Sequence, residues 1–315
     1  MQKKKTSWKK EKKIVQAKED GSEKEGLIVA HFGTSVEIED ENGNIITAHL
    51  RKNAEPCITG DKVLWREEAN NIFIVIKVLP RFNELVKPEK ANRTKLIAAN
   101  IKTIVIVAAP KPLYSRRLID RYIVAAELLN IKPVILFNKI DLLEKSEFEE
   151  VQDDLSIYEN IGYKVIYSCA ISKKGLKQII QSLHNKSAIL VGMSGVGKSS
   201  IIKALTNDEA VRVGEVSELT SHGKHTTTTT RLYHIEGGGS LIDSPGVREF
   251  ILSKVDPAEV IKGFVEFQEF AGECKFRNCQ HKSEPQCALL DAFDDNKICA
   301  ERWHSYHEIL AEMQD

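Results

Sequence analysis

The sequence predicts a protein of several domains: an N-terminal β-barrel of the OB type, a central α/β domain with a doubly wound, largely parallel sheet, and a small C-terminal helical domain. Three observations predict this architecture. Short alternating β segments fill 26–80, near-continuous apolar runs alternate with amphipathic segments from 101, and the strand patterns stop after about 252. A chain of 315 residues is long enough for two or three separate cores. The predicted boundaries are 1–25 for a basic flexible arm, 26–82 for the barrel, 83–252 for the α/β domain and 253–315 for the helical domain.

The barrel is predicted by five candidate strands with turn residues such as Gly33, Gly43 and Gly60 between them. Five strands in about 55 residues favour a small Greek-key barrel of the OB type, which commonly binds nucleic acid. An SH3-like barrel has a similar pattern, and a barrel that serves only for packing is a second alternative. The candidate strands are GLIVAHF, TSVEIED, NIITAHL, DKVLWREE and NIFIVIKVL.

The central domain is predicted by apolar segments of the Val, Ile and Leu type, as expected for strands buried on both faces. These segments are IKTIVIVAAP, KPVILFNK, YKVIYSC, SAILVGMS, RLYHIE and GSLIDSPG. Helices are expected over 116–130, 147–160, 174–184 and 198–206. After about 252, DPAEVIKGFVEFQEFAGE and ALLDAFDDNKICAERWHSYHEILAEM read as the helices of the last domain.

The formal net charge of zero conceals regions of one sign. Residues 1–26 hold nine Lys against five acidic residues, 81–121 hold ten Lys or Arg against three, and 283–315 hold eight acidic residues against two basic ones. The N-terminal Lys run is either a solvated arm or a contact to nucleic acid. No stretch approaches the roughly 18 apolar residues that span a membrane, and the N-terminus lacks the apolar segment of a signal peptide. We therefore expect a cytoplasmic protein without membrane association.

A phosphate loop is predicted at GMSGVGKSS, which matches G-x-x-x-x-G-K-[ST] between a candidate strand and a candidate helix. Glycines let backbone N–H groups face phosphates at the positive end of the helix. Lys198 is expected to contact the β and γ phosphates, and the Ser199 hydroxyl to bind Mg²⁺. The predicted nucleotide-binding residues of this loop are Gly192, Met193, Ser194, Gly195, Val196, Gly197, Lys198, Ser199 and Ser200.

Two loops earlier in the chain indicate that the base is guanine. N-K-x-D at 138–141 and YSCA at 167–170 each end a candidate strand, at the carboxyl edge of the sheet where ligands bind. Asp141 can accept hydrogen bonds from the N1–H and the exocyclic amine of guanine, a donor pair that adenine lacks. The predicted base-contacting residues are Asn138, Lys139, Ile140, Asp141, Ser168, Cys169 and Ala170.

The loop DSPG, 243–246, ends a later strand. Asp243 suits Mg²⁺ held through water, and the N–H of Gly246 can meet the γ-phosphate, although a plain turn would have the same residues. Base loops therefore precede the phosphate loop, the reverse of the usual order. Because the loops meet in space at one sheet edge, this order predicts a circularly permuted P-loop GTPase that uses GTP and Mg²⁺.

A switch segment is predicted at SELTSHGKHTTTTTRLYH, 217–234, because small hydroxyl residues suit closure on Mg²⁺ and the γ-phosphate; a plain polar loop is the alternative. Thr226 or Thr227 is the expected closing residue. The predicted magnesium ligands, direct or through water, are Ser199, Thr227 and Asp243. Val247 follows DSPG where Ras-like GTPases carry a water-orienting Gln, so another group must position the attacking water.

A structural zinc site is predicted in the C-terminal domain by three thiols and one imidazole within fourteen residues. The C-x4-C-x-H-x5-C spacing departs from the common C-x2-C fingers, and redox chemistry is the alternative. Lys and Arg side chains among these residues can present cations to RNA. The four candidate ligands are Cys274, Cys279, His281 and Cys287.

The permuted order, GKHTTTTTRLYH, DSPGVREF, the five-stranded module and the Cys/His spacing together resemble the ribosome small-subunit-dependent GTPase A family, over about 26–300. The resemblance implies a GTPase that binds the 30S subunit and 16S rRNA late in subunit maturation, with hydrolysis to GDP and phosphate stimulated by that subunit. It aligns His225 with the family's G-x-H-T-T-T motif. His225 is then the candidate to activate water, with an rRNA contact as the alternative. With His225, the catalytic candidates are Lys198, Thr226 and Thr227.

Ordering of 217–230 and 243–250 by the γ-phosphate is expected to reorient the zinc domain, so that RNA binding depends on the nucleotide. A permuted GTPase that serves the large subunit or another ribonucleoprotein remains an alternative. A nucleotide-gated RNA-binding scaffold with incidental hydrolysis is a further one, which Val247 favours. Nothing in the sequence demands more than a monomer.

Overall fold

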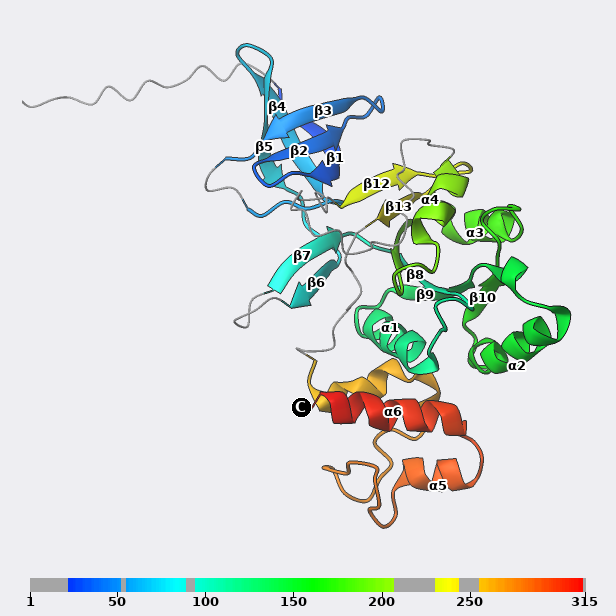
Figure 1. Ribbon diagram of the computed structural model, residues 1–315. Coiled ribbons are helices and arrows are strands. Elements are labelled where there is room, and N and C mark those ends of the chain that lie inside the picture. The colour runs from blue at the N-terminus through cyan, green and yellow to red at the C-terminus, as the bar shows by residue number, and fades with distance from the viewer. Residues whose placement is uncertain (1–21, 52–54, 89–93, 207–229, 244–254, 314–315) are drawn as a thin grey trace, which may run out of the picture.

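The computed structural model describes residues 22–51, 55–88, 94–206, 230–243 and 255–313 (Figure 1). Of the predicted switch, 217–234, the described residues include only 230–234. His225, Thr226, Thr227, Gly246 and Val247 all lie outside the described residues.

The N-terminal strands form a closed barrel, which confirms the predicted barrel. The strand order is β1-β2-β3-β5-β4, and β4 pairs back onto β1. Alternate side chains point inward and form a separate core that includes Ile28, Ile38, Trp65 and Val75. The strands are β1 Lys24–His31, β2 Ser35–Glu39, β3 Ile45–His49, β4 Lys62–Glu68 and β5 Ile72–Val78.

An antiparallel hairpin follows the barrel, formed by β6 (Glu84–Pro88) and β7 (Thr94–Ala99). The sequence patterns did not predict it. Its inner residues Leu85, Ile97 and Ala98 are buried in the core of the central domain rather than in that of the barrel. The hairpin therefore belongs, by its packing, to the central domain, and it projects beside the sheet in Figure 1.

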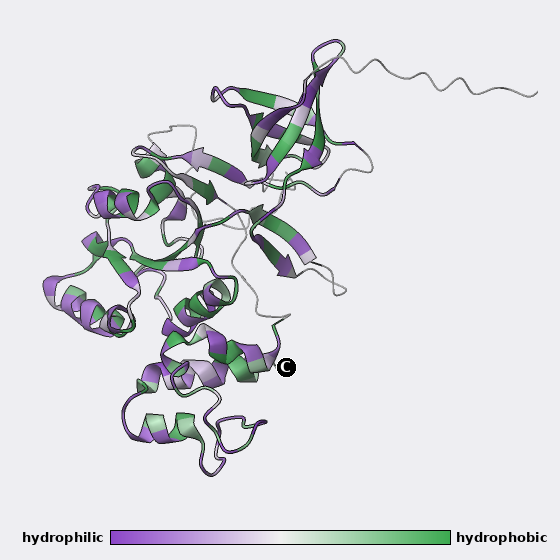
Figure 2. Ribbon diagram, turned by 180° about the vertical axis from the view of Figure 1, so that it is seen from behind, coloured by the Kyte–Doolittle hydropathy of each residue, from purple (hydrophilic) through white to green (hydrophobic). Residues whose placement is uncertain are grey.

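The central sheet has the order β10-β9-β8-β11-β13-β12, with β12 antiparallel to β13 and the other pairs parallel. Residues that alternate along each strand face two different apolar clusters: α1 and α2 cover one face, and α3 and α4 the other. The strands are mostly hydrophobic in Figure 2. The elements are β8 Thr103–Ala108, α1 Arg116–Leu128, β9 Lys132–Phe137, α2 Lys145–Ile161, β10 Lys164–Tyr167, α3 Leu176–Leu183, β11 Ser187–Val191, α4 Lys198–Thr206, β12 Arg231–His234 and β13 Ser240–Asp243.

The barrel and the central sheet are hydrogen-bonded into one sheet of eleven strands. Strand β1 of the barrel pairs antiparallel with β12, with Ala30 opposite Arg231. The two domains therefore share a backbone ladder in addition to their side-chain contacts.

The C-terminal region packs on α1 through the 3₁₀ turn η2 (Pro257–Gly263) and through α6 (Ala300–Glu312), and a second 3₁₀ turn, η3 (Val265–Phe267), packs on η2. The expected α-helix over DPAEVIKGFVEFQEFAGE is wrong in type, because the segment forms only these short turns. Gly263 approaches α1 so closely that a Cβ would lie 2.6 Å from Val124. The next residue, Phe264, stacks on Phe267 with ring centroids 4.9 Å apart, a pairing of positions three apart that 3₁₀ geometry favours.

A buried ion cluster fixes this region to α1. Arg302 of α6 is fully buried and donates to Asp120 of α1 at 2.5 Å and to Glu266 of η3 at 2.6 and 3.2 Å. Its guanidinium also lies over the ring of Phe264, 4.3 Å from the centroid. Burial raises the pKa of the Asp120 carboxyl, and the Arg302 charge offsets part of that rise.

Candidate functional site

The predicted phosphate loop connects β11 to α4, and its glycines have backbone geometry that other residues rarely adopt. Gly192 has φ +138°, and a Cβ there would lie 2.2 Å from the carbonyl oxygen of Val107. Gly197 has φ +98°, and a Cβ there would lie 2.3 Å from the side-chain nitrogen of Asn138. Val196 is buried and anchors the loop to the sheet, whereas the neighbouring Gly195 is exposed. The loop is thus tight, open on one side and shaped as a cradle.

Lys198 begins α4, and its ammonium lies across this cradle. Its Nζ donates to the carbonyl oxygens of Gly192 and Met193, both at 2.8 Å. The Lys198 charge also acts on Asp243 at the end of β13: burial raises the pKa of the Asp243 carboxyl, and Lys198 lowers it in part. A cation beside Asp243 would therefore stabilise its ionised form. Ser199, in the first turn of α4, is partly buried.

The predicted N-K-x-D loop packs directly on the phosphate loop. Asn138 is almost fully buried, and its Nδ2 donates to the carbonyl oxygen of Val196 at 3.0 Å. Its Oδ1 accepts a hydrogen bond from the Ser168 hydroxyl at 3.2 Å. One side chain thus connects three loops that are separated in the sequence. The contact between Asn138 and Val196 joins residues 58 positions apart.

Lys139 has a left-handed backbone, with φ 63°, and its ammonium crosses the rim of the cradle. Its Nζ donates to Gly195 at 2.5 Å and to Lys111 at 3.0 Å, in both cases to the backbone carbonyl oxygen. Asp141 follows in a 3₁₀ turn, η1 (Ile140–Leu142), with an exposed carboxylate, while Ile140 is buried below it. The open edge therefore presents a carboxylate beside an aliphatic lysine stem.

The second predicted base loop is fixed next to the first. The N–H of Ser168 donates to Phe137 at 2.8 Å, and the N–H of Ile140 donates to Ser168 at 3.3 Å. Cys169 is buried and forms an isolated antiparallel β-bridge with Lys174. Ala170, the last predicted residue of this loop, is partly buried.

Sequence reasoning missed Lys111 because it contributes only a backbone carbonyl, for which the sequence carries no signal.

A groove of about 450 Å³ lies between α1, α2 and α6 instead of over the phosphate loop. Within this groove Arg116 contacts Asp154 at 2.5 Å and Glu301 at 3.4 Å.

The structure brings the four predicted metal ligands together. Their ligand atoms all lie within 4.8 Å of one another. The Cys274 and Cys287 sulfurs are 3.8 Å apart, and His281 Nδ1 lies 3.5 and 3.4 Å from them. These four residues could hold a metal ion. Cys279 is the fourth of these residues.

The protonation preferences of this group suit a cation. Burial raises the pKa of the Cys279 thiol to about 12 and also raises the pKa of Cys287, so a cation is needed to hold them as thiolates. Burial lowers the pKa of His281, which favours the neutral imidazole that binds metals. The loop between His281 and Cys287 is held by Glu284, whose carboxylate accepts from the N–H groups of Gln280 and Lys282, both at 2.9 Å.

A doubly wound sheet, a phosphate loop, and an N-K-x-D loop that precedes it in sequence yet touches it in space define a circularly permuted GTPase. Residues 78–253 match the family model described as RsgA GTPase. The chain belongs to the RsgA GTPase family, and its activity is the hydrolysis of GTP.

Relatives and solved structures agree with this membership over most of the chain. The chain is 43% identical over 314 residues to "Small ribosomal subunit biogenesis GTPase RsgA" of Pseudomonas fluorescens (strain SBW25), covering 98% of this chain and 92% of that protein. It is 44% identical over 295 residues to the protein of that name from Pseudomonas aeruginosa (strain LESB58), covering 94% and 87%.

Two crystal structures are similar. YjeQ from Thermotoga maritima has a TM-score of 0.76 and 27% identity, covering 93% of this chain and 99% of that one. YloQ, described as a circularly permuted GTPase, has a TM-score of 0.73 and 27% identity, covering 93% and 96%. Among the described residues, no helix has the length and apolar character needed to cross a membrane.

Proposed function

We propose that this GTPase binds the small ribosomal subunit and assists its late maturation. The observation that carries the proposal is the junction of three nucleotide loops around one cradle, in a chain that closely matches proteins named for biogenesis of that subunit. The barrel and the Cys/His region would then provide the contacts to the subunit. We propose domain bounds of 26–82 for the barrel, 83–252 for the GTPase domain and 253–315 for the C-terminal domain, with 1–25 as a basic arm.

The nucleotide roles follow from the geometry of the loops. The exposed carboxylate of Asp141 would select guanine, and Lys139 would cover the base with its aliphatic stem. The loop N–H groups and Lys198 would hold the β and γ phosphates. Mg²⁺, when bound, would neutralise phosphate charge, with Ser199 and Asp243 as its protein partners. Burial raises the pKa of the Asp243 carboxyl and Lys198 offsets part of that rise, so a bound cation would further favour the carboxylate that this assignment needs.

We propose that the metal held by the three cysteines and His281 is zinc. With Zn–S of about 2.3 Å and Zn–N of about 2.0–2.1 Å, a tetrahedral site has S–S edges of about 3.8 Å and S–N edges of about 3.6 Å. The separations of 3.8, 3.5 and 3.4 Å fit those edges. Zinc would stabilise the folded C-terminal region, and no step of hydrolysis would involve it.

We further propose that subunit binding stimulates hydrolysis and that the bound nucleotide controls contact with 16S rRNA. Val247 leaves the attacking water without a glutamine, so an added partner is needed to complete the site, with His225 as the candidate group. Residues 244–256 join Asp243 to η2, and so connect the magnesium loop to the C-terminal region. A cytoplasmic monomer is the simplest form for this role.

The deciding experiment measures GTP turnover by the purified chain alone and with 30S, 50S or 70S particles. Stimulation only by 30S particles supports the proposal, and stimulation only by 50S particles contradicts it. His225→Ala should lose the stimulated rate while GTP still binds. His304→Ala, which removes an exposed histidine of α6, is the matched control and should keep it. A normal stimulated rate in His225→Ala would leave rRNA contact as the role of that residue.

A further inference from the structure

A buried threonine of the barrel contacts the strand that leads to the magnesium loop. Thr59 lies between β3 and β4, and its side chain is fully buried. Its hydroxyl donates to the carbonyl oxygen of Thr230 at 3.0 Å, across 171 positions of sequence. Thr230 directly precedes β12. The barrel therefore holds the beginning of β12 by a side chain as well as by the β1 ladder.

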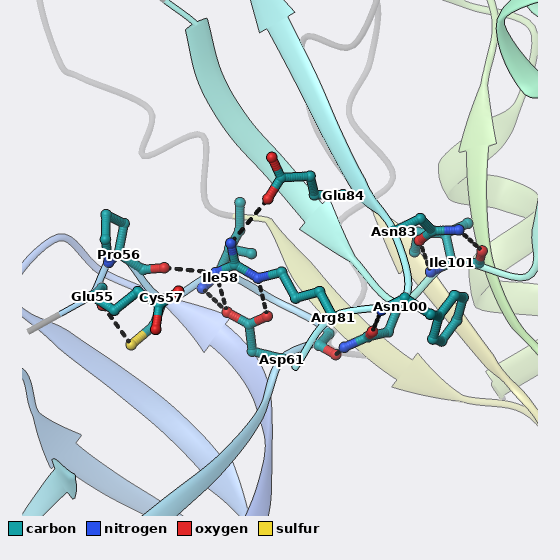
Figure 3. Close-up of polar contacts among 12 residues, drawn as sticks. Glu55, Pro56, Cys57, Ile58, Asp61, Arg81, Asn83, Glu84, Asn100 and Ile101 are labelled. Carbon is teal, nitrogen blue, oxygen red and sulfur yellow. Dashed lines mark hydrogen bonds and ion pairs between the residues drawn. The ribbon is translucent and has the colours of Figure 1, made fainter. Parts of the chain in front are cut away.

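The loop that carries Thr59 is rigid, because an ion pair and backbone bonds fix it from several sides. The Arg81 guanidinium donates to both carboxylate oxygens of buried Asp61, at 2.7 and 2.8 Å, and to the carbonyl of Pro56 at 2.6 Å (Figure 3). Asp61 in turn accepts the N–H of Ile58 at 2.8 Å.

The same loop also contacts the β6–β7 hairpin. The N–H of Ala99 donates to the carbonyl of Thr59 at 3.0 Å, and a Cβ at Gly60 would lie 2.2 Å from the carbonyl oxygen of Ala99. The side-chain Nδ2 of Asn100 donates a hydrogen bond to the carbonyl oxygen of Gly60 at 2.9 Å. Thr59 thus stands where barrel, hairpin and central sheet meet, and it has little freedom to move independently of them.

A continuous ladder runs from this junction to the magnesium loop. In register, Ala30 of β1 lies opposite Arg231 of β12, which lies opposite Asp243 of β13. Arg231 also forms an ion pair with Glu37 of the barrel. Any shift of the start of β12 relative to the barrel must therefore be passed to the strand partner of Asp243.

We propose that Thr59 is a positioning residue for the magnesium site of this GTPase: it fixes Thr230 and, through β12, the position of Asp243. The inference deepens the proposed function and rests on its assignment of Asp243 to Mg²⁺. It explains how a partner bound on the barrel would act on hydrolysis, since the barrel and the magnesium loop share one ladder. Thr59 itself touches neither nucleotide nor metal.

The test is a magnesium titration of nucleotide binding by the full chain, with a fluorescent N-methylanthraniloyl derivative of GTP as the probe. Thr59→Val keeps the side-chain shape and removes the donor, so the Mg²⁺ midpoint should rise about three- to tenfold, the factor that one hydrogen bond is worth. Nucleotide affinity in EDTA should stay within about twofold of wild type. Thr59→Ser restores the donor and should return the midpoint. Thr47→Val, on the exposed face of β3, is the matched control and should leave the midpoint unchanged.

Two results would overturn the inference. One is an unchanged Mg²⁺ midpoint in Thr59→Val; the other is an equal loss of affinity with Mg²⁺ and in EDTA, which would indicate general damage. Asp243→Asn separates this failure from failure of the proposed function. A raised midpoint in Asp243→Asn beside an unchanged one in Thr59→Val removes only the role of Thr59. An unchanged midpoint in Asp243→Asn removes the magnesium assignment and the inference together.

Discussion

Replacement of Arg302 by methionine should strongly destabilise the C-terminal region. Arg302 is fully buried, and it neutralises two carboxylates, of which the Asp120 side chain is 1% exposed and the Glu266 side chain 16%. Methionine keeps much of the aliphatic volume against Phe264, so the loss is mainly electrostatic. Removing one partner of a buried ion cluster costs about 3–5 kcal/mol, because the remaining charge is left without compensation. Because the site is buried, solvent screens the uncompensated carboxylate charge only weakly.

The pH dependence of the loss has a definite sign. Burial already raises the pKa of Asp120, and Arg302→Met removes the charge that offsets part of the rise. An acid whose pKa is higher in the folded state binds its proton more tightly there than in the unfolded chain. The free energy of unfolding therefore falls as the pH rises through that folded pKa and the proton is lost. The deficit of the variant should therefore be smaller at pH 5 than at pH 8.

Urea unfolding of the zinc-saturated chain measures this effect. Trp303 is adjacent to the cluster and nearly buried, and replacing the other two tryptophans by phenylalanine makes it the only indole reporter. Arg121→Met is the matched control, since Arg121 pairs with Glu312 at 2.7 Å where both side chains are about 30% exposed. That exposed pair should be worth less than about 1 kcal/mol.

The reasoning fails if Arg302→Met costs no more than Arg121→Met, or if its cost is the same at pH 5 and pH 8. Adding Asp120→Asn and Glu266→Gln to Arg302→Met should recover most of the lost free energy, because no buried charge then remains. Failure of this rescue would show that packing around Phe264, rather than charge, accounts for the loss.

Three other predictions concern the loops and the metal group. Asp141→Asn should weaken GTP relative to xanthosine triphosphate in competition binding, and an unchanged preference would refute its role in base selection. Gly197→Ala should abolish measurable nucleotide binding, because its Cβ would clash at 2.3 Å; Gly162→Ala has a similar φ of 102° with no atom within 4 Å and should bind normally. Elemental analysis should find one zinc per chain, none in Cys287→Ala and one in Cys299→Ala; zinc retained in Cys287→Ala would contradict the ligand set.

The sequence predicted the features that depend on local backbone or local periodicity. Alternation in the barrel strands and Val/Ile/Leu runs in the central sheet suffice for the barrel and the α/β domain, because each pattern reflects which faces a strand buries. The glycines of the phosphate loop carry their own backbone requirement, and the Cys/His spacing carries its chemistry. The strands, the phosphate loop and the Cys/His group can therefore be predicted without knowing which other elements pack against them.

Long-range packing could not be predicted in this way. The hairpin was missed because its few apolar residues, Leu85 and Ile97 among them, pack in the core of another domain and Pro88 interrupts the strand pattern. Arg302 looks like an ordinary charge on an amphipathic helix; its burial is decided by Asp120, 182 positions away. The contact of Thr59 with Thr230 has the same character.

The two ends of the central domain are attached in different ways. The C-terminal region is fixed to α1 by a buried ion cluster and stacked aromatic rings, contacts that tolerate little displacement. The barrel is attached through the β1–β12 register pair, the Thr59 hydroxyl, the hydrogen bonds of its Thr59–Gly60 loop to Ala99 and Asn100, and partly exposed ion pairs, and this attachment leads directly to Asp243. A change at the magnesium loop should therefore be passed to the barrel more directly than to the C-terminal region, because the barrel shares a ladder with Asp243. On this view Thr59→Val shifts the Mg²⁺ midpoint with little loss of stability, while Arg302→Met does the reverse. If Arg302→Met shifted the Mg²⁺ midpoint as strongly as Thr59→Val, this division would be wrong.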